Sequence, residues 1–168
     1  RMSKQTPWRK DLMFSSEKQD WATPQSFYDK VSSELGPFTL DACAIADNAK
    51  CSTFFSPEED GLTMSWEGYN VFVNPPYGKG IDKWIEKAYK ESQKKRTRVV
   101  MLIPARPDTK YWHNYVMNAH EIHFVKGRLK FGGCQNAAPF PSAVIVFGSQ
   151  WSTTSPPRAP HIHTMERL

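Results

Sequence analysis

Apolar residues along the chain form short continuous runs that alternate with segments of helical periodicity. Such runs predict strands buried on both faces, as in a parallel sheet. The runs are residues 38–41, 69–73, 99–103, 121–125 and 143–146. Apolar residues three or four apart predict helices at about 24–35, 81–95 and 108–118. This alternation predicts an α/β fold with a mostly parallel sheet.

Both ends of the chain lack this pattern. Residues 1–20 are polar and charged without a period, which predicts a flexible N-terminal segment. Residues 151–168 are rich in Ser, Thr, Pro and His, and we expect a disordered tail there. The remaining part, 21–150, is predicted to be a single domain, as the chain length of 168 residues favours.

Composition narrows the class of protein. A content of 39% hydrophobic and 13% aromatic residues is enough for a packed core, and the net charge of +5 favours a polyanionic partner. No stretch approaches the roughly 20 apolar residues that span a bilayer, and the N-terminus has no apolar leader. We therefore expect a monomeric cytoplasmic protein without membrane contact.

Metal chemistry is not indicated by the cysteines. The 3 cysteines form no CxxC pair and no Cys/His ligand spacing, so we expect reduced thiols and no metal site.

Polar residues follow three of the apolar runs. Asp41, Asn74 and Arg106 each come at or just after the end of a predicted strand. Because ligands of parallel α/β sheets bind beyond the carboxyl ends of the strands, we expect these three side chains to face one site.

The tetrapeptide Asn74-Pro75-Pro76-Tyr77 carries the most specific chemistry. The prolines hold φ near −65° and lack an N–H, so the Asn74 side-chain oxygen and the Pro75 carbonyl are fixed acceptors that can grip one amino group. Tyr77 offers a face on which a flipped base can stack. Taken alone, the tetrapeptide is also compatible with a proline-stiffened loop.

Several motifs in order resemble the phage-type DNA N6-adenine methyltransferase family. They are Trp21-x-Thr23-Pro24, residues 38–44, Asn48-Ala49-Lys50-Cys51, Asp60-Gly61-Leu62, residues 74–78, Pro104-Ala105-Arg106-x-Asp108-Thr109, residues 127–131 and residues 138–142. The resemblance covers most of residues 21–147. It implies a Rossmann-like methyltransferase fold with an antiparallel last strand, S-adenosylmethionine as cofactor, double-stranded DNA with a flipped adenine as substrate, and direct methyl transfer in the host cytoplasm.

The resemblance also implies a cofactor site. Its methionine end would involve Thr23, Pro24 and Asp41, with Ala42 and Cys43 following the first strand. The usual glycine-rich FxGxG is replaced by Asp41-Ala42-Cys43-Ala44. The acid near the adenosine stays open between Glu58, Glu59 and Asp60, and each of them is also compatible with solvated turn charge. Asp41 is likewise compatible with a helix cap.

Basic residues near the predicted site are candidates for DNA contact. They are Arg106, Lys110, Arg128 and Lys130, with Phe131 as the aromatic that the resemblance places against the extruded base. Base reading would come from loops 104–118 and 126–140. The alternative is a short hairpin strand in which Leu129 and Phe131 share one face and the charges are solvated. The lysine stripe along helix 81–95 is interpreted as a solvated face.

Two other functions fit part of this pattern. A protein-glutamine methyltransferase would use the same tetrapeptide to hold a side-chain amide, without needing a basic groove. A catalytically inactive DNA-binding module would use the basic residues alone. The excess of Lys and Arg argues against a protein-glutamine methyltransferase. Measured cofactor binding would distinguish an active methyltransferase from an inactive DNA-binding module.

Overall fold

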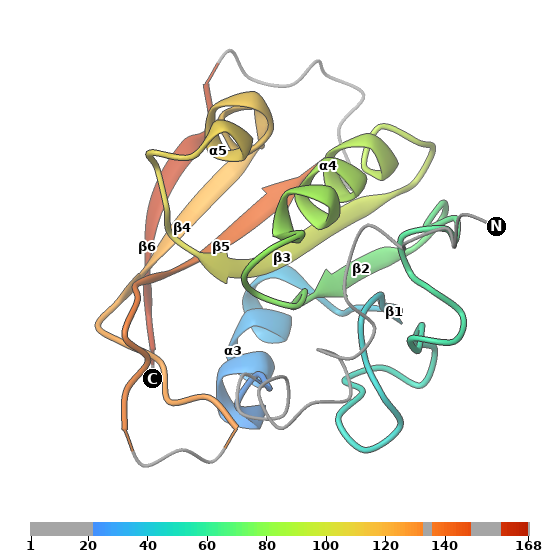
Figure 1. Cartoon of the computed structure of the whole chain (residues 1–168), viewed down its shortest axis with the longest axis horizontal. Helices are drawn as coiled ribbons and strands as arrows, with labels where there is room; N and C mark the ends of the chain where they lie inside the picture. Colours follow the sequence, from blue (N-terminus) through green and yellow to red (C-terminus); the bar gives the residue numbers. More distant parts are fainter. Residues whose placement is uncertain (1–21, 133–135, 149–158, 168) are drawn as a thin grey trace, which may run out of the picture.

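The computed structural model describes residues 22–132, 136–148 and 159–167. A six-stranded sheet in the order β1-β2-β3-β5-β4-β6 forms the centre of the molecule (Figure 1). The elements in chain order are α3 (Gln25–Leu35), β1 (Leu40–Asp41), β2 (Asn70–Val73), α4 (Ile81–Glu91), β3 (Arg98–Pro104), α5 (Lys110–Asn114), the 3₁₀ helix η1 (Val116–Asn118), β4 (Glu121–Lys126), β5 (Ser142–Phe147) and β6 (His161–Glu166).

The sheet is mostly parallel, as the sequence predicts. β1, β2 and β3 pair in parallel, and β4 pairs in parallel with β6. β5 is antiparallel to both of its neighbours, β3 and β4. β5 is the last strand that the sequence predicts, and its antiparallel direction is confirmed.

The prediction of a disordered tail is wrong for residues 161–166. They form β6, which pairs with β4 from Glu121↔His161 to Lys126↔Glu166. Only Met165 of this strand is buried, so its local composition carries almost no strand signal. The strand forms because it satisfies the backbone groups along an edge of β4, which is a tertiary effect. The predicted flexible segment 1–20 and the first part of the tail lie outside the described residues.

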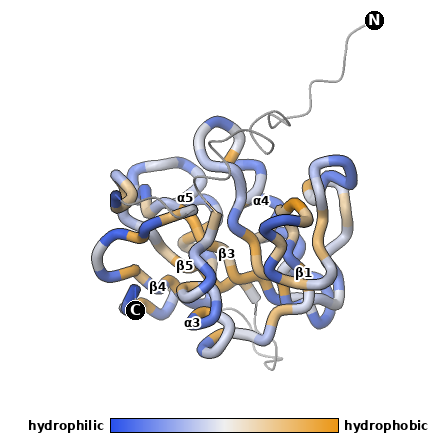
Figure 2. Tube along the Cα trace, turned by 90° about the horizontal axis from the view of Figure 1, so that it is seen from below, coloured by the Kyte–Doolittle hydropathy of each residue, from blue (hydrophilic) through white to orange (hydrophobic). Residues whose placement is uncertain are grey.

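Side chains of the sheet alternate between two apolar layers. Val99, Met101 and Ile103 pack toward α4 and α5, whereas Val100 and Leu102 pack toward α3. Figure 1 shows α3 on one side of the sheet and α4 and α5 on the other. Figure 2 shows hydrophobic residues along the inner strands and hydrophilic residues along the outer loops. This two-sided cover explains the continuous apolar runs.

Two helices are shorter than predicted. The predicted helix 81–95 ends at Glu91, and the chain turns at Arg96, whose φ is 53°. The predicted helix 108–118 is divided into α5 and η1 at Tyr115, whose φ of −126° is not helical. Within the described residues, no helix is long and apolar enough to cross a membrane.

Candidate active site

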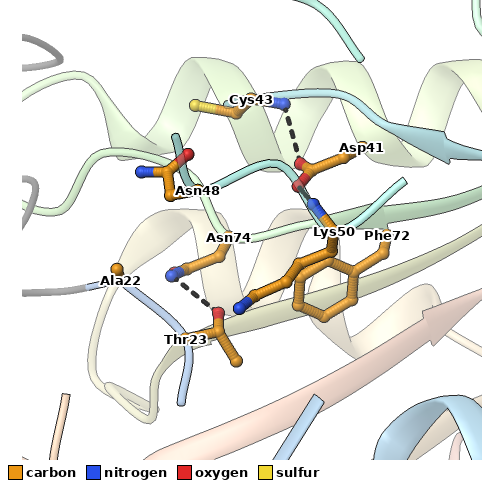
Figure 3. Close-up of a pocket in the computed structure, with 8 residues that line it drawn as sticks. All are labelled: Ala22, Thr23, Asp41, Cys43, Asn48, Lys50, Phe72 and Asn74. Atoms are coloured by element: carbon orange, nitrogen blue, oxygen red, sulfur yellow. Dashed lines mark hydrogen bonds between the residues drawn. The ribbon is translucent and has the colours of Figure 1, made fainter. Parts of the chain in front are cut away.

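A pocket opens at the carboxyl ends of β1 and β2, the edge where the sequence predicts a site. It contains about 260 Å³ of empty space, including its mouth. Figure 3 shows side chains from four segments of the chain around this space. The lining residues are Ala22, Thr23, Asp41, Cys43, Asn48, Lys50, Phe72 and Asn74.

Asn74 lies directly after β2 and is 5% exposed. Its Nδ2 donates a hydrogen bond of 3.0 Å to the Thr23 hydroxyl (Figure 3). The carbonyl of Ala22 accepts from the Gly132 amide at 2.9 Å. The structure thus brings together two predicted site residues, Thr23 and Asn74, and ties them to the loop that follows β4.

Asp41 ends β1 and is 3% exposed. Its Oδ1 accepts from the Cys43 amide at 3.3 Å, and its Oδ2 accepts from the Lys50 amide at 3.0 Å. Asp41 therefore closes the loop 42–50 rather than capping a helix.

Lys50 is a site residue that sequence reasoning did not identify. Its Nζ donates to Gln25 Oε1 at 2.9 Å and lies 5.9 Å from the centroid of the Tyr28 ring. Burial lowers the pKa of Lys50, against the opposing effect of Asp41 and Asp29. Asn48 shares the loop, and its Oδ1 accepts from the Ile45 amide at 3.0 Å. The sequence motif 48–51 includes both residues. In the sequence alone, however, nothing indicates that a lysine in a loop faces a pocket.

Two further cofactor candidates, Pro24 and Ala42, are sequence neighbours of lining residues but do not line the pocket themselves. Pro24 is the residue before α3, and Ala42 is buried directly after β1. A Cβ on Gly61 would meet the Ala42 carbonyl at 2.2 Å, so only glycine lets the turn 57–62 approach this closely.

The three acids of that turn differ in burial. Asp60 is 8% exposed, has a φ of 59°, and accepts from the Leu62 amide at 3.1 Å. Glu58 and Glu59 are exposed. The described pocket lining includes none of the three, so the choice among these acids stays open.

Tyr77 belongs to an aromatic cluster beside the pocket, and Pro75 and Pro76 are buried before it. Its ring meets Phe131 edge-on at 6.0 Å and Phe140 at 5.5 Å between centroids. The Tyr77 hydroxyl donates to the Leu102 carbonyl at 3.4 Å, and burial raises the Tyr77 pKa.

Phe131 differs from its predicted role, because it is 1% exposed and packs in the core. The structure does not present it to a base. The alternating exposure from Arg128 to Phe131 instead fits the alternative interpretation, in which Leu129 and Phe131 share a buried face and Arg128 and Lys130 are solvated.

Arg106, Lys110, Arg128 and Lys130 are all exposed. The Arg106 guanidinium carbon lies 6.0 Å from the centroid of the Phe140 ring, next to Tyr77. Arg128 and Lys130 follow β4, whose carboxyl end is at the same edge as that of β2. The predicted DNA-contacting cations are thus near the aromatic cluster and at the pocket edge of the sheet.

Comparison with known proteins gives the family. The model of the family described as DNA N-6-adenine-methyltransferase (Dam) matches residues 11–155. The chain belongs to the Dam family. This confirms the resemblance seen in the sequence motifs.

Named relatives of the Dam family include two phage proteins. The DNA N-6-adenine-methyltransferase of Haemophilus phage HP1 (strain HP1c1) is 33% identical over 111 residues, which are 66% of this chain and 64% of that protein. The DNA N-6-adenine-methyltransferase of Escherichia phage T1 is 31% identical over 110 residues, which are 65% of this chain and 45% of that protein. The putative methyltransferase YfdM of Escherichia coli (strain K12) is 33% identical over 63 residues, which are 34% of this chain and 69% of that protein. The chain thus spans less than two thirds of either phage relative.

Proposed function

We propose that this protein transfers a methyl group from S-adenosylmethionine to N6 of adenine in double-stranded DNA. The observation that carries the proposal is the buried Asn74, which lies at the carboxyl end of β2 beside Thr23 and in one pocket with Asp41. Membership of the Dam family supports the same reaction. A Rossmann-like arrangement of the sheet is part of this proposal.

Asn74 and Pro75 are proposed to hold the amino group of the target base. The bond from Asn74 Nδ2 to Thr23 fixes the side-chain amide, and this orients its oxygen to accept from an amine. Pro75 contributes its carbonyl, because neither proline of the turn has an N–H that would compete. With the cofactor bound, the amine nitrogen would form a bond to the methyl carbon while the carbon–sulfur bond breaks and leaves a neutral thioether. Both oxygens would stabilise the positive charge on the nitrogen until a proton is lost to water.

The pocket residues fit the amino-acid part of S-adenosylmethionine. When bound, this cofactor supplies an electrophilic methyl group on a sulfonium. Asp41 is suited to its amino group and Lys50 to its carboxylate, since both line the same pocket. The adenosine part would then extend beyond these lining residues. We propose that the turn 57–62 lies at that end.

The base must leave the duplex to reach Asn74, because an amine inside a base pair is not accessible. We propose that the half-buried Tyr77 supports the flipped base and that Arg106, Lys110, Arg128 and Lys130 hold the phosphates around it. The names of the phage relatives favour DNA over a glutamine amide as the substrate.

Methylation of plasmid DNA tests the proposal. Plasmid from a host without adenine methylation is incubated with the protein and S-adenosylmethionine and then sequenced with detection of N6-methyladenine. We expect modified adenines in one short sequence context, and none with Asn74→Ala. Methyl transfer to a glutamine peptide but not to DNA would contradict the proposal that DNA is the substrate. Binding of DNA with neither cofactor binding nor methylation would indicate an inactive module.

A further inference from the structure

Two histidines and a glutamate meet on β4 and β6, away from the pocket. The parallel register places His123 beside His163, and Glu121 lies two residues before His123 on the same face of the sheet. Glu121 is the first residue of β4, so the cluster starts at the amino-terminal edge, opposite the edge that holds Asn74. The proposed methyl transfer does not use these residues.

The donor atoms of this cluster lie close enough together to be candidate ligands of one metal ion. The distance from His163 Nε2 to Glu121 Oε1 is 3.2 Å, and that from His123 Nε2 to the same oxygen is 3.7 Å. One donor atom from each residue lies within 4.8 Å of the others. Zinc bonds of about 2.0–2.2 Å at tetrahedral angles place neighbouring ligand atoms about 3.3–3.6 Å apart. Binding of one ion would require the side chains to rotate so that their donor atoms converge, because the two imidazole planes are now nearly parallel.

The burial of His123 is a second observation that indicates a ligand. The residue is 8% exposed, and its Nε2 has no hydrogen-bond partner among the described residues. An unpartnered buried nitrogen costs about 1–3 kcal/mol. The ring is stacked on His163 at 4.6 Å between centroids and 18° between planes, so the two imidazoles are already held side by side. A bound cation would give this nitrogen its partner.

The donor types narrow the choice of ion. Imidazole nitrogen with one carboxylate oxygen is typical of zinc and of other late first-row metals, whereas Mg²⁺ and Ca²⁺ prefer oxygen ligands alone. His163 is 43% exposed, which leaves room for water at the fourth position. The ligands come from two strands, β4 and β6, and β6 is the last strand in the described part of the chain.

We propose that Glu121, His123 and His163 bind one Zn²⁺ ion with water as the fourth ligand, and that the ion fastens β6 to β4. The cysteine pattern of the sequence predicts no metal site, but it does not bear on a site made of histidines. This inference is independent of the proposed methyl transfer, because it requires neither cofactor nor DNA.

Metal binding to the full chain tests the inference. Protein freed of metal with a chelator is titrated with ZnCl₂ by calorimetry, and its thermal unfolding is recorded with Zn²⁺ or with Mg²⁺. We expect one equivalent of Zn²⁺ to bind and to raise the melting temperature, with no rise in Mg²⁺. His163→Ala removes a ligand itself and should weaken zinc binding by at least the roughly 10–100-fold that the loss of an outer-shell partner costs. Its exposed position predicts that the variant still folds.

Two controls make the result specific. His113→Ala removes an exposed histidine on α5 and should bind Zn²⁺ like the wild type. Co²⁺ added in place of Zn²⁺ should give the visible bands of a tetrahedral site without a thiolate charge-transfer band, which excludes the cysteines as ligands. Absence of saturable zinc binding, equal binding by His163→Ala, or a thiolate band would each overturn the proposal.

Discussion

Replacement of Asn74 should lower the rate of methyl transfer while leaving cofactor binding largely unchanged. In Asn74→Ala the acceptor for the target amine is lost, and we expect kcat to fall by about 100-fold or more, as for loss of one group that stabilises developing charge. The dissociation constant of S-adenosylmethionine should change by less than about threefold, because the other pocket residues remain. Single-turnover methylation and calorimetry measure the two effects.

Asn70 provides a matched control for this experiment. It is an equally buried asparagine at the other end of β2, 5% exposed, and its Nδ2 donates to the Pro37 carbonyl at 2.6 Å. Asn70→Ala should lower the free energy of unfolding but leave turnover per folded molecule unchanged. Normal turnover by Asn74→Ala would remove this residue from the mechanism.

Asp41 is expected to act in both folding and cofactor binding. Asp41→Asn keeps one acceptor for the loop amides of Cys43 and Lys50 but replaces the other with a donor, so stability should fall by about 1–3 kcal/mol. Loss of the charge should raise the S-adenosylmethionine dissociation constant at least about tenfold, or roughly 1.4 kcal/mol. Calorimetry below the melting temperature of the variant measures this.

A cofactor fragment distinguishes these two effects of Asp41. Methylthioadenosine lacks the amino-acid part, so its affinity should be the same for the wild type and for Asp41→Asn. If both ligands lose affinity equally, Asp41 acts only through the shape of the loop.

The sequence predicts the position of a pocket residue where that residue lies at the end of a predicted strand. Asp41 and Asn74 were predicted to face one site because each ends an apolar run, and both line one pocket. Lys50 could not be assigned, since it reaches the pocket through a bond from its own amide to Asp41. His123 and His163 are 40 positions apart, and only the pairing of β4 with β6 brings them together.

At the scale of elements, periodicity predicts burial better than it predicts boundaries. The alternation from Arg128 to Phe131 predicted the correct buried face, although the resemblance suggested a different use for Phe131. β6 escaped prediction because it depends on an edge of β4. Arg167, the residue directly after β6, contacts the loop after β4 by donating to the Arg128 carbonyl at 3.3 Å.

Helix α4 is held by a buried carboxylate, and this predicts an acid-sensitive stability. Glu91 is 1% exposed, accepts from the Trp66 amide at 3.3 Å, and pairs with Lys87 at 2.6 Å and Lys94 at 2.5 Å. Burial alone would raise the Glu91 pKa, but the bonds from Lys87 and Lys94 outweigh it and lower the pKa. Lys87 and Lys94 belong to the lysine stripe of this helix, and their positive charges are neutralised by Glu91.

A lowered pKa means that the unfolded state binds the proton more readily than the folded state. The stabilisation by Glu91 is therefore complete above the unfolded pKa of about 4.3 and is lost as pH falls through the lower folded value. Glu91→Gln should cost about 1–3 kcal/mol at pH 7, and the difference from wild type should shrink below about pH 4. Urea unfolding at several pH values measures it.

Glu86→Gln is the control for Glu91 on the same helix. Glu86 pairs with Lys90, whose side chain is 66% exposed, so its loss should cost less than about 1 kcal/mol. An equal loss of stability in both variants, or a difference for Glu91→Gln that does not change with pH, would contradict the role given to Glu91.

At the scale of the whole molecule, the parallel strands carry the proposed chemistry at one edge of the sheet. The sequence predicted this edge because strands that run the same way end on the same side. It could not predict that the same sheet carries a histidine cluster toward the other edge, since that cluster depends on β6. It also could not predict how closely the turn 57–62 approaches Ala42, which depends on Gly61.

The distribution of basic residues over the two edges leads to a test of DNA binding. Arg128 and Lys130 are exposed at the pocket edge, whereas Lys95 is exposed in the turn before β3, at the opposite edge. Removing a cation that binds one phosphate should reduce the slope of log K against log salt by roughly 0.9. Arg128→Ala and Lys130→Ala should each show this reduction, and Lys95→Ala should not.

Phe131→Ala completes this series, and here the structure changes the expectation drawn from the sequence. Because Phe131 is 1% exposed and packs against Tyr77, its truncation should cost about 3–5 kcal/mol of stability and leave the salt slope unchanged. Binding isotherms on duplex DNA at several salt concentrations require no knowledge of the recognition sequence, because the phosphate contribution is independent of sequence. One slope shared by the wild type and all four variants would mean that the loop after β4 does not contact DNA, and the phosphates would then have to be held by Arg106 and Lys110 alone among the proposed cations.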